Sequence, residues 1–232
     1  APAVLCTATQ PALGPLFAEF LPGRPAVELC PPELCPPESF RRVCFRQAGR
    51  LDWDTLSGQL QQHEQVLCVV NSRKSAQEIF TRLSGEGNFH LSTLMYPAHR
   101  RAKLEEIRRR LREGLPCRVI STSLIEAGVD VDFPAVFREE AGLDSILQAA
   151  GRCNREGKRP VSESIVTLFR GEAAPPPLFQ TAIGAGRMVL EQYDDIASRE
   201  AIQAYFHTLL ELKGAEAQDI YGILPKIRTE LF

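Results

Sequence analysis

The stretch QVLCVVNSRKSAQEIFTRLS, from Gln65 to Ser84, contains the pattern that decides the fold. Its first part is a nearly continuous apolar run, which is typical of a strand in a parallel sheet covered on both faces. Polar residues follow at once, and from Ser72 onward the apolar residues recur at helical spacing. A buried strand that leads directly into a helix is the repeating unit of α/β proteins with a parallel sheet.

The same alternation of strands and helices continues on both sides of this stretch. Gly114 is expected to end one of the helices, because glycine readily adopts the left-handed backbone of a helix C-terminus. We therefore predict an α/β fold, a doubly wound parallel sheet flanked by helices. Strands are expected at residues 39–47, 65–71, 90–96, 117–123, 135–140 and 163–169, and helices at 53–63, 72–84, 97–114 and 145–156.

The predicted sheet is bounded by segments of different composition. Residues 11–37 are rich in proline and repeat LCPPE at Leu29 and at Leu34, which favours an extended connector. From Gln180 onward the pattern is helical, so we expect a C-terminal helical appendage. We place the domain boundaries at 1–38, 39–172 and 173–232, and because the chain opens inside a strand-like run we expect it to be part of a larger protein.

Composition narrows the class of protein. The 232 residues carry a formal net charge of -2, so any site for a polyanion must be a local concentration of Lys and Arg. No segment approaches the roughly 20 apolar residues of a membrane span. An odd number of cysteines, seven, within apolar runs favours reduced thiols and a cytoplasmic location. A zinc site at Cys30 and Cys35 with Cys44 is the alternative, but a fourth ligand is missing from this pattern.

Polar clusters follow several of the predicted strands. Ligands of open α/β sheets bind beyond the carboxyl ends of the strands. We therefore expect one site to be built from the loop after the strand near Val70, the segment STSLIEAGVDVDFP and the approach to QAAGRCNR.

The arginines of QAAGRCNR have two interpretations. With Ser145 as N-cap and Gln148 as its capping-box partner, Gln148, Gly151, Arg152 and Arg155 would share one helix face. That face is either solvated or directed at a nucleotide triphosphate, where arginines stabilise the transferring charge. Gly151 would allow a phosphate or another backbone to approach closely.

The segment STSLIEAGVDVDFP carries two carboxylates on one side of an extended chain, Asp130 and Asp132. They could bind a metal ion, or accept hydrogen bonds from a ribose hydroxyl or from the nearby arginines. Thr122 and Ser123, just past a strand, offer groups that fix a nucleic-acid phosphate.

The helix PAHRRAKLEEIRRRLREG is strongly basic. Its distal part, residues 108–112, is interpreted as a solvated face interleaved with glutamates. His99 and Arg100 follow a strand and a proline, and are better candidates for a phosphate contact.

Together, TAT (Thr7–Thr9), VLCVVNSRKSAQEIF, HLSTLMYPAHR, VISTSLIEAGVDVDFP and LDSILQAAGRCNREG occur in an order that resembles the later motifs of superfamily 2 helicases. The last two motifs are most similar to those of the CRISPR-associated helicase-nucleases of type I interference systems. The resemblance covers residues 1–169. It implies two RecA-like domains that clamp ATP and Mg²⁺, single-stranded DNA crossing both, an HD nuclease domain, and recruitment by a crRNA-guided surveillance complex.

The resemblance also assigns roles to individual residues. The arginine-finger motif corresponds to Gln148, Arg152 and Arg155, and ATP contacts to Gly128, Asp130 and Gly151. Coupling positions are Thr7, Thr9 and Glu126. Nucleic-acid contacts are expected at Asn71, Ser72, Arg73, His99, Arg100, Thr122 and Ser123.

The sequence lacks the phosphate-binding loop G-x-x-x-x-G-K-[ST], the acidic box for Mg²⁺ and an HD pair. We therefore expect the chain to be the second RecA-like domain of such an enzyme and to hydrolyse no ATP alone. The alternatives are another superfamily 2 DNA or RNA helicase, or a non-catalytic RecA-like interaction module.

Overall fold

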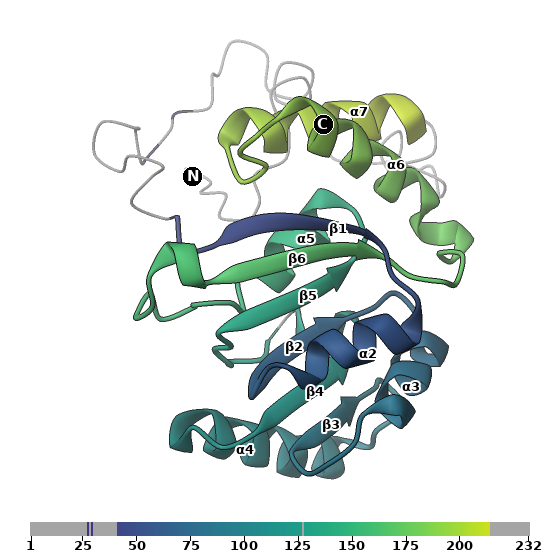
Figure 1. The fold of residues 1–232 in the computed structure, drawn as a ribbon. Coiled ribbons are helices and arrows are strands. Elements are labelled where there is room, and N and C mark those ends of the chain that lie inside the picture. Colours follow the sequence, from purple (N-terminus) through teal and green to yellow (C-terminus); the bar gives the residue numbers. More distant parts are fainter. Residues whose placement is uncertain (1–26, 28, 30–40, 127, 214–232) are drawn as a thin grey trace, which may run out of the picture. The chain divides into compact units, whose positions relative to one another are not determined.

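The computed structural model describes residues 27, 29, 41–126 and 128–213 of the chain (Figure 1). Two units are present, one within residues 30–177 and the other including residues 178–232. Thr7, Thr9, Cys30 and Cys35 lie outside the described residues, so the predictions made for them stay predictions.

The larger unit is built on a parallel sheet. Its strand order is β1-β6-β5-β2-β4-β3, and every pairing is parallel, which confirms the predicted doubly wound α/β fold. The strands are β1 (Cys44–Arg50), β2 (Gln65–Val69), β3 (Asn88–Leu91), β4 (Cys117–Ser121), β5 (Ala135–Glu139) and β6 (Ile165–Arg170).

Helices cover both faces of this sheet: α2 (Trp53–Gln61), α3 (Arg73–Arg82), α4 (Pro97–Glu113) and α5 (Leu143–Ala150) (Figure 1). Leu56 and Leu60 of α2 and Ile79 of α3 pack in one core with Cys68 and Phe137. On the opposite face, the Cys117 thiol contacts the Ile107 carbonyl of α4, and α5 packs against β5. The layers are therefore helix, sheet and helix, as expected for a doubly wound sheet.

Local sequence signals fix several helix ends. The Ser72 hydroxyl accepts a hydrogen bond from the Ser75 N–H at 3.0 Å and caps α3, which therefore begins where the helical spacing was predicted to start. At the end of α4, Gly114 adopts a left-handed backbone with a φ of 68°, as predicted. The strands that differ most from expectation are β1, which begins at Cys44 and continues to Arg50, and β3, which ends at Leu91. The Ser92 carbonyl and hydroxyl accept from the Met95 and Leu94 N–H groups, which turns the chain away from the sheet.

The smaller unit contains the expected C-terminal helices, α6 (Pro177–Gln192) and α7 (Arg199–Lys213). Each buries an apolar stripe, with Ile183 and Val189 on α6 and Ala201 and Tyr205 on α7. Ser198 caps α7, since its hydroxyl accepts from the Ala201 N–H at 3.1 Å. The helical appendage is thus confirmed as part of the fold class.

Two glycines before β3 provide a matched test of packing. Gly85 and Gly87 have φ angles of +79° and +80°, but a Cβ at Gly87 would lie 2.2 Å from the Pro116 carbonyl oxygen, whereas none lies near Gly85. Both alanine variants strain the backbone, and only Gly87→Ala adds a backbone collision. We expect Gly87→Ala to lower the free energy of unfolding by about 1–3 kcal/mol more than Gly85→Ala, measured by urea denaturation. Equal losses would contradict the close approach.

Candidate nucleotide and nucleic-acid site

The carboxyl ends of β2 and β5 mark the point where the sheet changes direction. These neighbouring strands lead to opposite sides of the sheet, since β2 continues to β3 and β5 to β6. Such a switch point is where open α/β sheets place their ligands. Asn71 follows β2 and Glu139 ends β5, so both lie at this edge.

Five polar side chains meet there, and they are called the edge cluster: Asn71, Glu126, Arg138, Glu139 and Ser145. Arg138 is central, with its Nη1 donating to Asn71 Oδ1 at 2.9 Å and its Nη2 donating to Ser145 Oγ at 2.8 Å. The Ser145 hydroxyl in turn donates to the Glu126 carboxylate, whose oxygens lie at 2.8 and 2.9 Å. The Asn71 N–H donates to Glu139 Oε2 at 2.7 Å. The cluster thereby ties β2 and β5 to α5.

Burial governs the electrostatics of the edge cluster. Arg138 and Glu126 form an ion pair with Nε and Oε1 3.3 Å apart, and only 3% and 7% of their side chains are exposed. Burial raises the pKa of Glu126, and the charge of Arg138 and the Ser145 hydrogen bond oppose this rise. Burial likewise raises the pKa of Glu139, against the hydrogen bond from Asn71. Burying these charged groups costs desolvation free energy, and the ion pair between Arg138 and Glu126 offsets that cost.

The arginine-bearing helix is shorter than predicted. α5 ends at Ala150 and its N-cap is Gly142, so Ser145 lies inside the helix and forms no capping box with Gln148. The expectation that Gln148, Gly151, Arg152 and Arg155 share one helix face is therefore wrong. The helix ends because the Phe133 backbone pairs with the following residues, accepting from the Asn154 N–H and donating to the Arg152 carbonyl.

The residues after α5 form a compact turn, Gly151–Arg159, called here the Arg155 turn. Asp130 pairs with Arg155, with Oδ1 2.9 Å from Nε. Asp132 accepts from the Arg155 N–H at 2.7 Å and pairs with Arg159 at 3.0 Å. The predicted contact between these carboxylates and the arginines is confirmed, and a role toward a ribose stays a prediction.

The expected single site at the carboxyl edge is divided between the two ends of α5. Ser145 belongs to the edge cluster, whereas the Arg155 turn follows the helix and pairs with Phe133, which precedes β5. Ser145 precedes Gly151 by six positions, a helical rise of about 9 Å. The sequence places these motifs next to each other, but the helix between them carries the chain across the sheet.

Arg152 connects the two parts. Its Nε donates to the Ile125 carbonyl at 3.0 Å and its Nη2 to the Glu126 carbonyl at 2.6 Å. Only 8% of the residue is exposed, and burial lowers its pKa, with the charge of Arg155 as the next cause. Because its donors are bound to backbone, Arg152 fixes the segment that carries Glu126. Its predicted contact with ATP stays a prediction.

The other predicted ATP contacts lie around the same turn. Gly128 is exposed with a φ of +69°, a conformation that favours glycine. Gly151 is also exposed, and the nearest atoms to a Cβ there are carbonyl oxygens of its own helix, at 3.3 and 3.5 Å. Gln148 is half-buried on α5. The roles of these residues toward ATP stay predictions.

The predicted nucleic-acid contacts at the start of α3 differ in availability. Asn71 is bound within the edge cluster, and its Nδ2 also donates to the Glu140 carbonyl at 2.7 Å. Ser72 caps α3, while Arg73, the first helical residue, is exposed. Arg73 is thus the member of this group whose side chain is best placed for a phosphate.

A second group lies around the ends of β3 and β4. His99 is exposed at the start of α4 and its ring lies 5.5 Å from that of exposed Tyr96, while Arg100 is half-buried. After β4, Ser123 is exposed and Thr122 is buried. All four predicted residues of this group follow strands at the carboxyl edge, and their contact with DNA stays a prediction.

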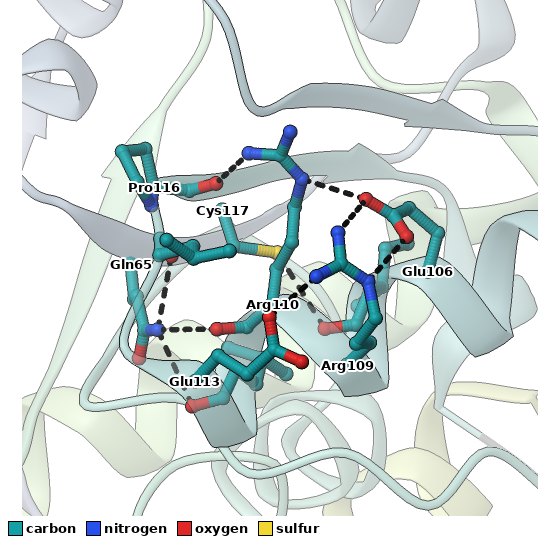
Figure 2. Close-up of polar contacts among 10 residues, drawn as sticks. Gln65, Glu106, Arg109, Arg110, Glu113, Pro116 and Cys117 are labelled. Carbon is teal, nitrogen blue, oxygen red and sulfur yellow. Dashed lines mark hydrogen bonds and ion pairs between the residues drawn. The ribbon is translucent and has the colours of Figure 1, made fainter.

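The distal part of α4 uses its arginines within the chain (Figure 2). Arg109 and Arg110 both pair with Glu106, at 2.8 and 2.9 Å, and Arg109 also pairs with Glu113. Hydrogen bonds from Arg109 and then Arg110 lower the pKa of Glu106 to about 2. Gln65 donates to the Leu115 carbonyl at 3.1 Å, which joins the helix end to β2. Glutamate is interleaved with these arginines as predicted, but the face is only partly solvated, because Arg108 and Arg110 are half-buried.

Within the described ranges, no group of three or more His, Cys, Asp or Glu side chains is arranged to hold a metal ion. The Asp130–Asp132 metal pair is therefore replaced by the ion pairs with Arg155 and Arg159. None of the described helices is both long and apolar enough to cross a membrane. Cys44, Cys68, Cys117 and Cys153 are free thiols, and burial raises the pKa of Cys117 and of Cys153 to about 12.

Sequence reasoning missed Arg138 and Glu139 of the edge cluster and Asn154 of the Arg155 turn. Arg138 and Glu139 stand at the end of the otherwise apolar strand AVFREE, next to a predicted ligand-binding edge. Charged residues in a strand covered on both faces are a signal of a buried polar network. Asn154 has a φ of 48°, and no local pattern indicates this conformation.

The sheet, its switch point and the arginine-bearing turn define a RecA-like α/β domain. Residues 62–158 match the family model described as "CRISPR-associated nuclease/helicase Cas3, C-terminal". The predicted resemblance is confirmed over these residues.

The chain is also similar to a curated relative and, in fold, to solved structures. The chain is 26% identical over 166 residues to the CRISPR-associated nuclease/helicase Cas3 of Methanothermobacter thermautotrophicus, covering 67% of this chain and 20% of that protein. It resembles in fold the structure named "Crystal structure of T. fusca Cas3-ATP", with a TM-score of 0.59 and 13% identity. The match covers 90% of this chain and 27% of that chain. It also resembles in fold a chain of the structure named "CRISPR RNA-guided surveillance complex, pre-nicking", with a TM-score of 0.52 and 14% identity. The match covers 92% of this chain and 29% of that chain. The chain thus spans a fifth of the length of the curated relative.

Proposed function

We propose that this chain is the second RecA-like domain of an ATP-dependent helicase-nuclease that translocates on single-stranded DNA and degrades invading DNA in CRISPR interference. Arg155 faces the triphosphate of an ATP molecule bound between this domain and a first RecA-like domain. The match of residues 62–158 to the Cas3 C-terminal family supports this proposal.

The geometry of Arg155 carries the proposal. Its backbone N–H is fixed by Asp132, while 41% of its side chain is exposed. Its partner Asp130 is 80% exposed, and an ion pair this exposed is worth about 0–1 kcal/mol. Arg155 can therefore leave Asp130 for a phosphate at little cost, while its position on the turn is preserved.

The remainder of the ATP site is assigned to the first RecA-like domain. Phosphoryl transfer needs a loop that cradles the phosphates and carboxylates that hold Mg²⁺, and this sequence contains no G-x-x-x-x-G-K-[ST] loop. On this side the nucleotide is surrounded by Gly128, Asp130, Gly151 and Gln148. Arg152 fixes the neighbouring segment through the Ile125 and Glu126 carbonyls. One solved neighbour is a Cas3 named with ATP, which supports nucleotide binding by the family.

DNA is placed at the carboxyl edge of the sheet. Exposed Arg73, His99 and Ser123 contact phosphates there, with Asn71, Ser72, Arg100 and Thr122 behind them. Glu126 couples the two ends of α5, because its carboxylate belongs to the edge cluster and its carbonyl is bound by Arg152. Thr7 and Thr9 complete the coupling from the first domain.

Further partners follow from the family. We assign an HD nuclease domain to the same protein and a crRNA-guided surveillance complex as the recruiting partner. The likeness to a chain of a surveillance-complex structure supports that partner. Free thiols at the described cysteines support a cytoplasmic location.

A comparison of the 232-residue chain with the complete protein tests the proposal. The chain alone is expected to show no DNA-stimulated ATP hydrolysis, because it lacks the phosphate loop, whereas the complete protein hydrolyses ATP and moves 3′-to-5′ on single-stranded DNA. Phosphate release and strand displacement are the measurements. Robust DNA-stimulated turnover by the chain alone, or a complete protein that moves on RNA and not on DNA, would refute the proposal.

A further inference from the structure

Asn154 is the most constrained residue of the Arg155 turn. It is 1% exposed and has the positive φ of 48° that favours Gly or Asn. Its Nδ2 donates to the Arg42 carbonyl at 2.9 Å and to the Arg159 carbonyl at 2.8 Å, and its Oδ1 accepts from the Arg159 N–H at 3.0 Å. Both donors and the acceptor of the amide are therefore used.

Arg42 returns the contact. Its Nη1 donates to the carbonyl of Arg155, the residue that follows Asn154. The Arg155 backbone is thus held at both ends, at its N–H by Asp132 and at its carbonyl by Arg42. Arg42 stands two residues before β1, so these bonds attach the Arg155 turn to the chain that enters the sheet.

From this geometry we infer that Asn154, together with Arg42, is a positioning residue that aims Arg155 at the nucleotide. The buried amide of Asn154 fixes the backbone of the Arg155 turn. The exposed side chain of Arg155 remains free to move. The inference rests on the proposed function of Arg155. It assigns to Asn154 a part in ATP turnover that acts through Arg155.

Glycine is the informative replacement. Asn154→Gly keeps the left-handed backbone and removes the amide bonds alone, so strain and hydrogen bonding are separated. In the complete helicase we expect ATP turnover, kcat, to fall about 10–100-fold, because a small misplacement of a catalytic group costs up to about 100-fold. The KM for ATP and the affinity for single-stranded DNA are expected to stay near wild type. Lys158→Ala, on the same turn with its side chain 76% exposed, is the matched control and should leave kcat unchanged.

The double variant Asn154→Gly/Arg155→Ala decides how Asn154 acts. If Asn154 works through Arg155, the double variant is no slower than Arg155→Ala alone. Additive losses, or a wild-type kcat for Asn154→Gly beside an impaired Arg155→Ala, would overturn the inference and leave the proposed function intact. A wild-type kcat for Arg155→Ala would instead refute the proposed role of Arg155.

Arg42 provides an independent variant, because its side chain is exposed and its replacement spares the core. Arg42→Ala removes the bond to the Arg155 carbonyl but keeps the Arg42 carbonyl that Asn154 binds. We expect a smaller decrease in kcat than for Asn154→Gly, with partial rescue by Arg42→Lys, which retains a donor. An Arg42→Ala variant with wild-type kcat would contradict the two-sided hold on Arg155.

Discussion

In the complete helicase, Arg155→Ala is expected to lower ATP turnover by about 10³-fold or more, the range of an arginine finger. The affinity for single-stranded DNA should stay near wild type, because Arg155 stands at the other end of α5 from the carboxyl edge at which we propose DNA to bind. Steady-state phosphate release and fluorescence anisotropy on a labelled oligonucleotide measure the two effects separately. Loss of DNA affinity with normal turnover would contradict the assignment.

Arg73→Ala is the matched control for that experiment. Arg73 is an exposed arginine at the carboxyl edge, at the first position of α3. Its removal should weaken DNA binding and lower the dependence of binding on log salt concentration by about one phosphate contact. Turnover at saturating DNA should change little. Together, the two expected results would distinguish the proposed nucleotide site from the proposed DNA site.

Arg152 is a less informative position for substitution than Arg155. Its guanidinium is bound to the Ile125 and Glu126 carbonyls inside the domain, so Arg152→Ala leaves buried acceptors without donors. Any loss of turnover in that variant combines a structural effect with a catalytic one. Arg155, whose side chain is exposed, is the residue at which catalysis can be tested cleanly.

Replacing Arg138 by methionine is expected to lower the free energy of unfolding by about 3–5 kcal/mol, the cost of leaving a buried charge unpaired. Arg138 and Glu126 are almost fully buried and neutralise each other. Removal of the arginine also deprives Asn71 and Ser145 of a donor. Urea denaturation of the 232-residue chain measures the loss.

Two control variants show what causes the loss of stability in Arg138→Met. Arg82→Met removes an arginine whose partners Asp54 and Glu78 are exposed, so its cost should be within about 1 kcal/mol. The double variant Arg138→Met/Glu126→Leu removes both buried charges and should recover much of the stability, since apolar pairs often replace buried ion pairs without loss. A double variant as unstable as Arg138→Met would show that packing, and not the unpaired charge, dominates.

Much of the fold could be predicted because its signals are local. The apolar run before Asn71, the cap at Ser72 and the glycine at 114 each act within a few residues, and the strand–helix alternation follows from them. The end of α5 could not be predicted, because QAAGRCNRE is compatible with a helix throughout. The contact that stops the helix comes from the backbone of Phe133, which lies in another segment.

The contact between the carboxylates and arginines of the candidate site could be predicted, whereas the arrangement of its parts around α5 could not. Motif order identified Arg155, Asp130 and Glu126, and the structure brings Arg155 and Asp130 into contact. The length of α5 decides that Arg155 and the carboxyl-edge loops, where we propose DNA to bind, lie at opposite ends of the helix, and the sequence predicted a longer helix. Asn154 was missed because its role depends on a bond to Arg42, 112 residues away in the chain.

The position of β1 at the sheet edge has a consequence for how the protein is made. β1 is paired with β6, and the Arg46–Thr167 contact across this pair joins residues 121 positions apart. During synthesis β1 leaves the ribosome before the other described strands but cannot pair until β6 has emerged, so the sheet closes last along this edge. Pairing between strands this distant in sequence is slow, and unpaired strand edges promote aggregation in the interval. Production of this domain should therefore depend on chaperones and on translation speed more than its folded stability suggests.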